Sequence, residues 1–266
     1  MQIRSCIICA IINNMRLDKL IPVENKKLTV ELTGVKYFLP ENLQQRIDDH
    51  WDGIVSGNKH LFRGEVFVVS DIKASKDNIR IKLDVSDYAH YIYGRKVGLP
   101  EKYVCKNLHT SCLIETADSV LVFGKMGEGT ELPGKMQCAG GGLDNDDICG
   151  SKVSLEHNIK KELLEEVGID VGDRTMVSDF DLKYLKGSAK TNSLAAIFIL
   201  KLKITAREIA KLYAQLERRL EREKLLPEFS ELVYLQKNRV AVNEFYAKEK
   251  SHFDQYLEAL LNAVVE

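Results

Sequence analysis

Apolar and polar positions along the first hundred residues predict strands and turns around one helix. Residues 28–39 are rich in β-forming side chains, and Pro40 then opens an amphipathic helix that runs to about residue 55. The apolar runs 60–72 and 79–83 flank the polar turn ASKDN and predict a hairpin. The ring-rich segment 87–94 predicts a short helix.

From residue 103 onward, apolar strands alternate with segments of helical periodicity. Because this alternation lacks a βαβ rhythm, we predict an α+β fold rather than a doubly wound one. Gly98 and Pro100 mark a boundary between a β-rich accessory region, 1–100, and a main domain, 101–266. The main domain is predicted to contain strands at 104–114, 119–124, 180–186, 194–203 and 232–236, and helices at 154–167 (with Gly168 as its C-cap), 205–224 and 242–264.

Composition and charge narrow the class of protein. The chain is 45% hydrophobic and 29% charged, which is ordinary for a globular protein with a real core. Its net charge of −1 argues against broad nucleic-acid binding, although a small anionic ligand remains compatible. The early apolar run, 6–12, is too short to cross a bilayer, so we interpret it as a buried strand and expect no membrane association.

Six cysteines are scattered along the chain, which indicates a reducing compartment rather than a disulfide framework. We therefore expect a cytoplasmic protein. Cys6 and Cys9 have the spacing of half a zinc site, but no second Cys or His pair accompanies them. Because both lie in an apolar run, buried structural cysteines are the favoured interpretation.

Glu162, Glu165 and Glu166 are the strongest candidates for chemistry. Their spacing places three carboxylates on one ridge of a helix, opposite an apolar face. Mutual repulsion makes such a ridge unfavourable alone, and a hard cation such as Mg²⁺ or Mn²⁺ relieves it. The alternative is a solvated Glu/Lys face, which is the default interpretation for an isolated KKELLEE segment. The apolar side of this helix is predicted to consist of Leu155, Ile159, Leu163 and Val167.

The surroundings of the glutamates favour the metal site. A glycine triplet, Gly140, Gly141 and Gly142, lies upstream, and bare backbone of this kind allows close approach to a phosphate. Together these features resemble the Nudix hydrolase family, whose box reads G-x5-E-x7-R-E-U-x-E-E-x-G-U, with U aliphatic. Residues 161–169 match its second half, with Lys161 in place of Arg.

The first half of the box departs from the family pattern. Five residues after Gly141, Asp147 stands where the family has Glu, and thirteen rather than seven residues separate it from Lys161. An insertion of six residues within 147–153 reconciles the spacing; alternatively, Glu156 takes the place of the acid. In the family this acid braces the arginine. Because lysine cannot form a bidentate fork, we expect a looser brace here.

The resemblance implies a Nudix-type mixed sheet flanked by helices and a cofactor of Mg²⁺ or Mn²⁺. It further implies that Glu162, Glu165 and Glu166 hold the metal and take part in catalysis, with the glycine triplet near the bound phosphates. The reaction would be hydrolysis of the diphosphate linkage in a small nucleoside diphosphate derivative. One of the carboxylates would accept a proton from the attacking water.

Features outside the box are similar to the UDP-glucose pyrophosphatase branch of the family. In that branch an acid precedes the last strand, and the matching residue here is Glu228, as a further metal ligand or catalytic base. The alternative is an ordinary loop glutamate after Pro227. A UDP-sugar is therefore a candidate substrate. The other matching features are Trp51, the segments 61–67 and 84–88, the strand 193–199 and the long helix after it.

Other interpretations remain open. A catalytically impaired Nudix fold would be a nucleotide-binding or regulatory module, and hydrolysis of ADP-ribose or a dinucleotide is not excluded. Gly129, Gly134 and Lys135 match part of a phosphate-binding loop, but Met136 replaces the required Ser or Thr and no helix follows. Residues 1–100 contribute a lid, a substrate wall or a dimer surface, and a homodimer is left open.

Several further side chains are candidates for contacts with a nucleotide. Aromatic rings can stack on a base and cationic side chains can meet phosphates. For each of them, burial in the core or solvation at the surface is the default interpretation. The aromatic candidates are Phe62, Phe67, Tyr91, Tyr93 and Tyr184, and the cationic ones are Arg63, Lys125 and Lys135.

Overall fold

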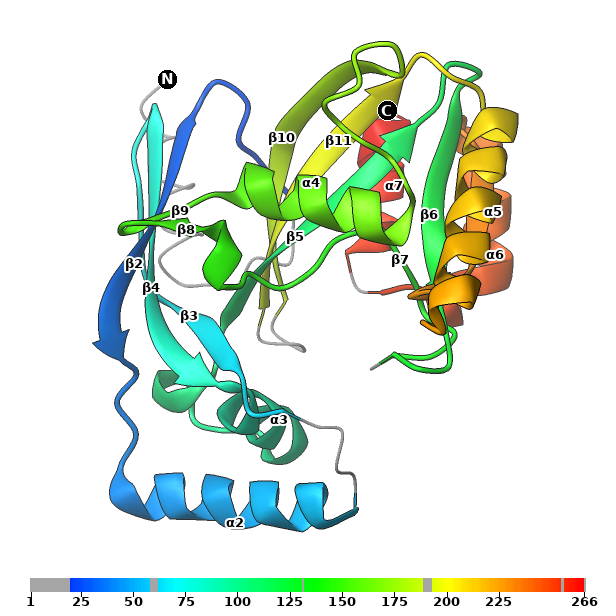
Figure 1. Ribbon diagram of the computed structural model, residues 1–266. Coiled ribbons are helices and arrows are strands. Elements are labelled where there is room, and N and C mark those ends of the chain that lie inside the picture. Colours follow the sequence, from blue (N-terminus) through cyan, green and yellow to red (C-terminus); the bar gives the residue numbers. More distant parts are fainter. Residues whose placement is uncertain (1–19, 58–61, 131, 189–192, 255, 266) are drawn as a thin grey trace.

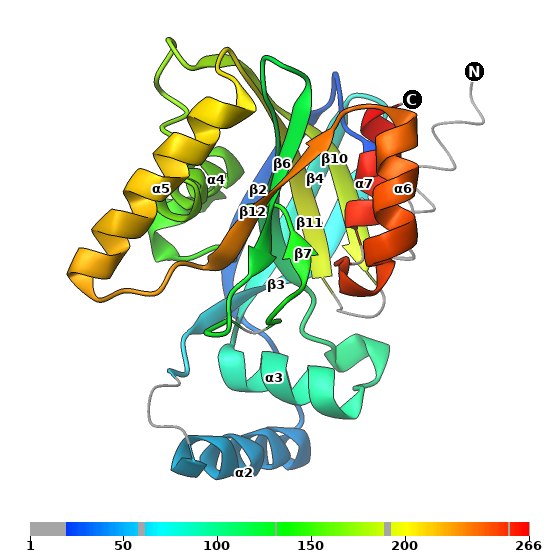
Figure 2. The same cartoon turned by 90° about the vertical axis from the view of Figure 1, so that its right-hand side faces the viewer.

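A computed structural model of the chain describes residues 20–57, 62–130, 132–188, 193–254 and 256–265. In this part of the chain, twelve strands form one mixed sheet in the order β1-β10-β11-β5-β3-β4-β2-β9-β8, and β6 pairs with β5, β7 and β12. Helices flank the sheet (Figures 1 and 2), which confirms the predicted α+β class.

Most of the predicted elements are present, within a few residues of their expected bounds. The strands are β1 (Ile21–Pro22), β2 (Lys27–Lys36), β3 (Glu65–Ala74), β4 (Asn78–Asp87), β5 (Asn107–Glu115), β6 (Val120–Met126), β7 (Met136–Gln137), β8 (Ile148–Cys149), β9 (Lys152–Val153), β10 (Val177–Ser188), β11 (Ser193–Leu202) and β12 (Phe229–Gln236). The α-helices are α2 (Glu41–Gly57), α3 (Tyr88–Val97), α4 (Leu155–Glu166), α5 (Ala206–Glu223), α6 (Arg239–Glu249) and α7 (Leu257–Val264), and the 3-10 helices are η1 (Glu101–Tyr103), η2 (Asn145–Asp147) and η3 (Lys250–His252).

The N-terminal part of the described chain contains the predicted hairpin and two helices that pack together. β3 and β4 pair antiparallel, whereas β2 pairs parallel with β4. Asp87 caps α3, because its side chain accepts from His90 N. Arg63 reaches Asp48 of α2 and Asp87 at 2.7 and 2.8 Å, which ties the two helices together.

The N-terminal strands continue the sheet of the C-terminal part. Val68 of β3 pairs with Asn107 of β5. Leu32 N of β2 donates to Ser151 O at 2.8 Å, in the segment that leads to α4. Figure 1 shows β2 beside the β8–β9 segment for this reason. The division into two domains at residue 100 stays a prediction.

Side chains of the central strands alternate between two apolar layers. Leu108, Cys112 and Ile114 of β5 belong to the layer that contains the inner residues of α4 and α5. Leu113, between them, belongs to the layer with Val242 of α6 and the leucines of α7. This alternation follows from the two-residue period of a strand. The sheet therefore lies between α4 and α5 on one side and α6 and α7 on the other (Figure 2).

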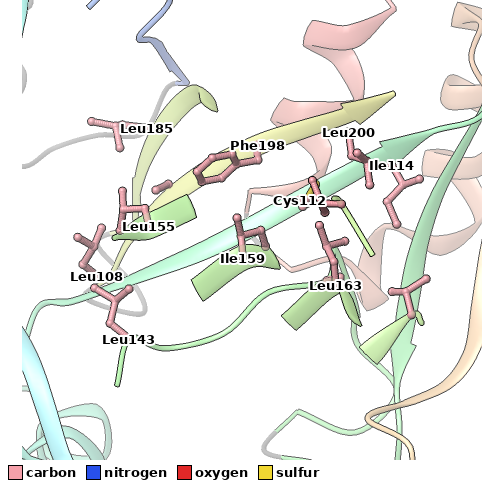
Figure 3. Close-up of a cluster of buried hydrophobic side chains, with 14 of the residues drawn as sticks. Leu108, Cys112, Ile114, Leu143, Leu155, Ile159, Leu163, Leu185, Phe198 and Leu200 are labelled. Atoms are coloured by element: carbon pink, nitrogen blue, oxygen red, sulfur yellow. The ribbon is translucent and has the colours of Figure 1, made fainter. Parts of the chain in front are cut away.

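Helix α4 carries the glutamate ridge and packs through leucine and isoleucine side chains. Ser154 caps its first turn by accepting from His157 N at 3.1 Å. Ile159 and Leu163 are fully buried against β5 and β11, as Figure 3 shows. The C-cap is Val167, one residue before the expected Gly168, which follows with a φ of 79°. The apolar face thus fixes the rotation of α4 on the sheet.

Helix α5 begins and ends as the sequence predicts. Thr205 and Glu208 form a capping box at its start. Lys224 ends it in the left-handed conformation, with a φ of 58°. The chain then passes through residues 225–228 into β12, which pairs with β6.

The prediction of one continuous helix over 242–264 is wrong, because the chain forms α6 and α7 with η3 between them. Phe253 forms a bridge with Met136 of β7, and Asp254 N donates to Met136 O at 2.9 Å. Backbone groups that bond to a neighbouring strand are unavailable to a helix, so the helix stops before them.

Two sequence predictions concern thiols and the N-terminal run. Cys6, Cys9 and the apolar run 6–12 lie outside the described residues. Cys105, Cys112 and Cys138 are buried free thiols, and Cys149 is an exposed one. Among the helices that the structure describes, none is long and apolar enough to cross a membrane.

Candidate active site

Gly140 and Gly141 allow the backbone after β7 to pass between β5 and α4. Gly140 has a φ of 147°, and a Cβ there would lie 2.2 Å from Thr110 O. Its N–H donates to Glu166 Oε2 at 2.9 Å. A Cβ on Gly141 would lie 2.5 Å from Glu162 Oε1. Because both positions lack a side chain, the loop backbone lies directly against two of the ridge glutamates.

The three ridge glutamates near the end of α4 meet different surroundings. Glu165 is exposed, Glu162 is half-buried, and Glu166 is only 6% exposed. The last turn of α4 contains no basic residue, so these acids also oppose the helix dipole. Glu162 and Glu166 therefore form the inner part of the predicted ridge, and Glu165 its outer part.

Glu228 reaches the same place from the segment between α5 and β12. Gly127 N donates to Glu228 O at 2.7 Å, which holds this backbone close to the end of β6. The next residue, Phe229, is buried over Gly124, where a Cβ would lie 2.1 Å from its ring. The Glu228 side chain lies close enough to Glu166 for its charge to raise the pKa of that carboxyl group. The chain thus brings together two glutamates that lie far apart in sequence, while their roles stay predictions.

Burial and repulsion between carboxylates raise the pKa of the inner glutamates. Burial raises the pKa of Glu162 to about 7, although Lys161 opposes this shift and Glu165 adds to it. Burial, followed by the charges of Glu228 and Glu162, raises the pKa of Glu166 well above its usual value. Charged carboxylates that lie close together repel one another, so a bound proton or cation stabilises this cluster.

Lys161 pairs with Asp144, not with Asp147 as the family pattern predicts. Its Nζ lies 2.5 Å from Asp144 Oδ2. Burial lowers the pKa of Lys161, but the hydrogen bond to Asp144 and the charges of the nearby carboxylates together outweigh this effect and raise the pKa above its usual value. Asp144 rather than Asp147 meets Lys161 because of η2, a single 3-10 turn that directs Asp147 into the interior and leaves Asp144 beside α4. The run LDNDD offers three acids, and its sequence alone does not show which one faces the lysine.

Asp147 instead holds the segment between the glycine loop and α4. It is 2% exposed, and its Oδ2 accepts from Asp144 N and Asn158 Nδ2, both at 2.9 Å. Its Oδ1 lies 3.1 Å from His157 Nδ1. The sequence analysis missed Asn158, although a polar residue beside Ile159 on the inner side of an amphipathic helix is a recognisable signal of a buried polar contact.

The extra length of the box forms the hairpin of β8 and β9. Ile148 pairs with Val153, and Lys152 pairs with Glu31 of β2. The insertion predicted within 147–153 therefore coincides with a segment that joins the sheet edge. The alternative acid, Glu156, is exposed and pairs with Lys160 at 2.5 Å, so its carboxylate is engaged on the outer surface of α4.

The donor chemistry of this cluster fits a hard divalent cation. Glu162, Glu166 and Glu228 influence one another electrostatically and supply only carboxylate oxygens, the ligands that Mg²⁺ and Mn²⁺ prefer. A bound cation would relieve the repulsion between these carboxylates. Among the described residues, no three acidic, His or Cys side chains are already arranged as a set of metal ligands.

The cationic candidates for phosphate contacts have partners within the protein. Arg63 bridges two aspartates, Lys125 pairs with Glu231 at 3.1 Å, and Lys135 Nζ donates to Ser251 O at 2.7 Å. Met136, after the partial phosphate-binding loop, starts the strand β7 rather than a helix. A helix N-terminus is what such a loop requires, so this alternative is wrong.

Most of the aromatic candidates belong to apolar clusters. Phe67 and Tyr93 are buried, Tyr91 stacks on Tyr88, and Tyr184 packs against the layer under α7. Phe62 is 81% exposed. Its exposure leaves Phe62 as the most accessible ring of the five.

A surface hollow of about 680 Å³ in the N-terminal part is lined by Tyr37, Phe38, Val69, Ser70, Asp84, Glu101, Lys102, Tyr103, Val104 and Lys106, and none of the site glutamates borders it.

Comparisons with known proteins give only a limited likeness. No protein-family model and no curated protein match the chain. Among solved structures, the chain is similar to DR0079 from Deinococcus radiodurans (12% identity, 60% of this chain, 83% of that chain, TM-score 0.41). It is also similar to a MutT protein from Methanosarcina mazei (14%, 59% and 91%, 0.38) and a Nudix hydrolase from Nitrosomonas europaea (15%, 60% and 91%, 0.35). At such values the likeness carries no weight for function, which depends on the side chains described above.

Proposed function

We propose that this chain is a metal-dependent hydrolase of the Nudix type, which cleaves the diphosphate linkage of a nucleoside diphosphate derivative. One observation carries the proposal: Glu162 and Glu166 of α4 meet Glu228 beside the glycine loop, with raised pKa values for both helix glutamates. Bringing carboxylates together in this way is unfavourable unless a proton or a cation is bound. The match of residues 161–169 to the Nudix box supports the same assignment.

The side chains have separate roles in the proposed mechanism. Glu162, Glu165 and Glu166 would hold Mg²⁺ or Mn²⁺, which supplies positive charge for the diphosphate and lowers the pKa of water. Gly142 borders open space, so its backbone is the part of the glycine loop that a phosphate can approach. Glu228, whose charge acts on Glu166, would accept a proton from the attacking water. The products are two phosphate monoesters.

Within this class we propose a UDP-sugar as the substrate, on the resemblance of Glu228 and the N-terminal features to the UDP-glucose pyrophosphatase branch. The products would then be UMP and a sugar 1-phosphate. ADP-ribose and dinucleotides contain the same diphosphate linkage. A substrate panel therefore has to include all three classes.

A second candidate function is a nucleotide-binding or regulatory module without turnover. The observation that favours it is the partly exposed pair Lys161–Asp144, which stands in place of the family's arginine brace.

One experiment separates the two functions. The protein is assayed with Mg²⁺ and with EDTA on UDP-sugars, ADP-ribose and dinucleotides, and the products are identified. We expect Mg²⁺-dependent release of two phosphate monoesters, and a loss of about 10²- to 10⁴-fold in kcat for Glu166→Gln. Glu231→Gln, at an exposed glutamate of β12, is the matched control and should keep wild-type turnover. Nucleotide binding without turnover would overturn the hydrolase proposal and support the binding module.

Two broader predictions accompany this proposal. We propose a cytoplasmic location on the scattered cysteines, and an accessory role in substrate binding for residues 1–100. A homodimer stays open. Sedimentation of the full chain measures its oligomeric state directly.

A further inference from the structure

A buried asparagine lies at the centre of a polar network behind the glycine loop. Asn158 of α4 is fully buried, and its Nδ2 donates to both Gly142 O and Asp147 Oδ2 at 2.9 Å. Its Oδ1 accepts from Thr110 Oγ1 at 2.5 Å. Thr110 and Asp147 are themselves 1% and 2% exposed. The amide thus uses both of its hydrogens and its oxygen within the protein interior.

This network joins four elements that meet at the candidate site. Thr110 belongs to β5, Gly142 ends the glycine loop, Asp147 ends η2, and Asn158 lies one helical turn before Glu162. The backbone connects the same parts, because Thr110 N donates to the loop carbonyl of Gly141 at 3.0 Å. Asn158 therefore links β5, the glycine loop and η2 to the helix that carries the inner glutamates.

We propose that Asn158 is a positioning residue, which holds the glycine loop against α4 so that the loop backbone meets Glu162 and Glu166. The catalytic consequence of this role rests on the proposed function, whereas its effect on the loop does not. The competing brace is Lys161–Asp144, whose side chains are 22% and 52% exposed. Ion pairs that are open to solvent stabilise little, so the buried amide dominates.

An asparagine satisfies all three partners at this position, whereas a carboxylate or an apolar side chain does not. A carboxylate offers no donor to Gly142 O or Asp147, and it would place a second negative charge beside a buried one. An apolar side chain leaves Thr110, Gly142 and Asp147 without a partner in the interior, which is costly. The neighbouring inner residue Ile159 is apolar. The contacts with the glycine loop, and not the packing of the helix on the sheet, therefore explain why residue 158 is polar.

Hydrogen exchange of the full chain tests the positioning role without any assay of activity. We expect Asn158→Ala and Thr110→Val to speed amide exchange in residues 139–147 by about 10- to 100-fold, because the loop loses its buried anchor. Thr110→Ser keeps the hydroxyl group and should restore slow exchange. Leu260→Ala, in a fully buried position of α7 on the other side of the sheet, is the control for general destabilisation. In Leu260→Ala, amide exchange in residues 139–147 should stay slow relative to amide exchange in β5.

Steady-state kinetics with Mg²⁺ and the best substrate of the panel tests the catalytic consequence. We expect Asn158→Ala to lower kcat by about 10- to 100-fold, as is usual for residues that orient metal ligands, with little change in KM. If the wild-type protein hydrolyses no diphosphate, the proposed function fails, and the exchange measurement still decides the role of Asn158. Equal exchange of 139–147 in Asn158→Ala and Leu260→Ala, compared at matched stability, would overturn the inference. Unchanged exchange in Thr110→Val would overturn it as well.

Discussion

The helix α4 and the loop 140–153 form the same candidate site but are held in place by different forces. α4 is fixed by apolar side chains, with Ile159 and Leu163 fully buried in the layer shown in Figure 3. The loop is fixed by backbone contacts at Gly140 and by the side chains of Asp147 and Asn158. Apolar contacts are non-directional, whereas hydrogen bonds require defined distances and angles. The helix therefore sets where the glutamates stand, and the loop sets their immediate environment.

Shortening a buried apolar side chain of α4 should have the largest effect on the free energy of unfolding. Leu163→Ala removes a fully buried side chain and should lower the free energy of unfolding by about 3–5 kcal/mol. Urea denaturation measures this change. Leu164→Ala, at an adjacent leucine that is 45% exposed, is the matched control and should change it by less than about 0.5 kcal/mol. Equal losses in the two variants would contradict the packing of α4 described here.

On the loop side, the first glycine should be the least tolerant position. Gly140→Ala combines a φ of 147° with a Cβ only 2.2 Å from Thr110 O, and should cost about 3 kcal/mol of unfolding free energy. Gly142→Ala meets no atom within 4 Å and is the control, with an expected change below about 1 kcal/mol. A stable Gly140→Ala protein with wild-type turnover would show that the close approach of the loop to β5 is unnecessary.

The raised pKa values predict a pH dependence in metal-free protein. The pKa of Glu162 is about 7 in the folded state, against 4.5 for an ordinary glutamate, so the folded state binds the proton more tightly. Its contribution to stability is therefore lost as pH rises from about 4.5 to about 7. With EDTA present, the unfolding free energy of the wild type should fall by about 1–3 kcal/mol over this range relative to Glu162→Gln. Parallel pH profiles of the two proteins would contradict the raised pKa.

Substitution of Gly141 should affect turnover more than the free energy of unfolding. A Cβ on Gly141 would lie 2.5 Å from Glu162 Oε1, the end of a flexible side chain that can move aside. Gly141→Ala should therefore change the unfolding free energy by less than about 1 kcal/mol but lower kcat about tenfold, as a displaced carboxylate requires. Thermal unfolding and steady-state kinetics on one preparation test both halves. Wild-type kcat would show that the position of Glu162 is not set by the loop.

The same contrast explains how much the sequence reveals. Helix α4 is predictable because its apolar period and the cap at Ser154 are local signals. The capping box of α5, at Thr205, is local as well. By contrast, the different burial of Glu165 and Glu166 depends on the glycine loop and on Glu228, which contact α4 only in the folded chain.

The predictions from the sequence are wrong where segments that are far apart in the sequence come into contact in the fold. Asp144 rather than Asp147 faces Lys161, because η2 reverses the direction of the chain between the two aspartates. The final helix is interrupted because Phe253 pairs with Met136, which is more than a hundred residues earlier. Neither pairing has a local signal, since each partner segment alone is compatible with several conformations.

A double-mutant cycle on Glu166 and Glu228 tests most directly whether two distant segments form one hydrolytic centre. The turnover of the preferred diphosphate substrate is measured with saturating Mg²⁺ for the wild type, Glu166→Gln, Glu228→Gln and the double variant. If the pair acts as a unit, each single variant should lose about 10²- to 10⁴-fold in kcat, and the double variant should lose little more than either. Wild-type turnover in Glu228→Gln, or losses that simply multiply in the double variant, would contradict a shared centre.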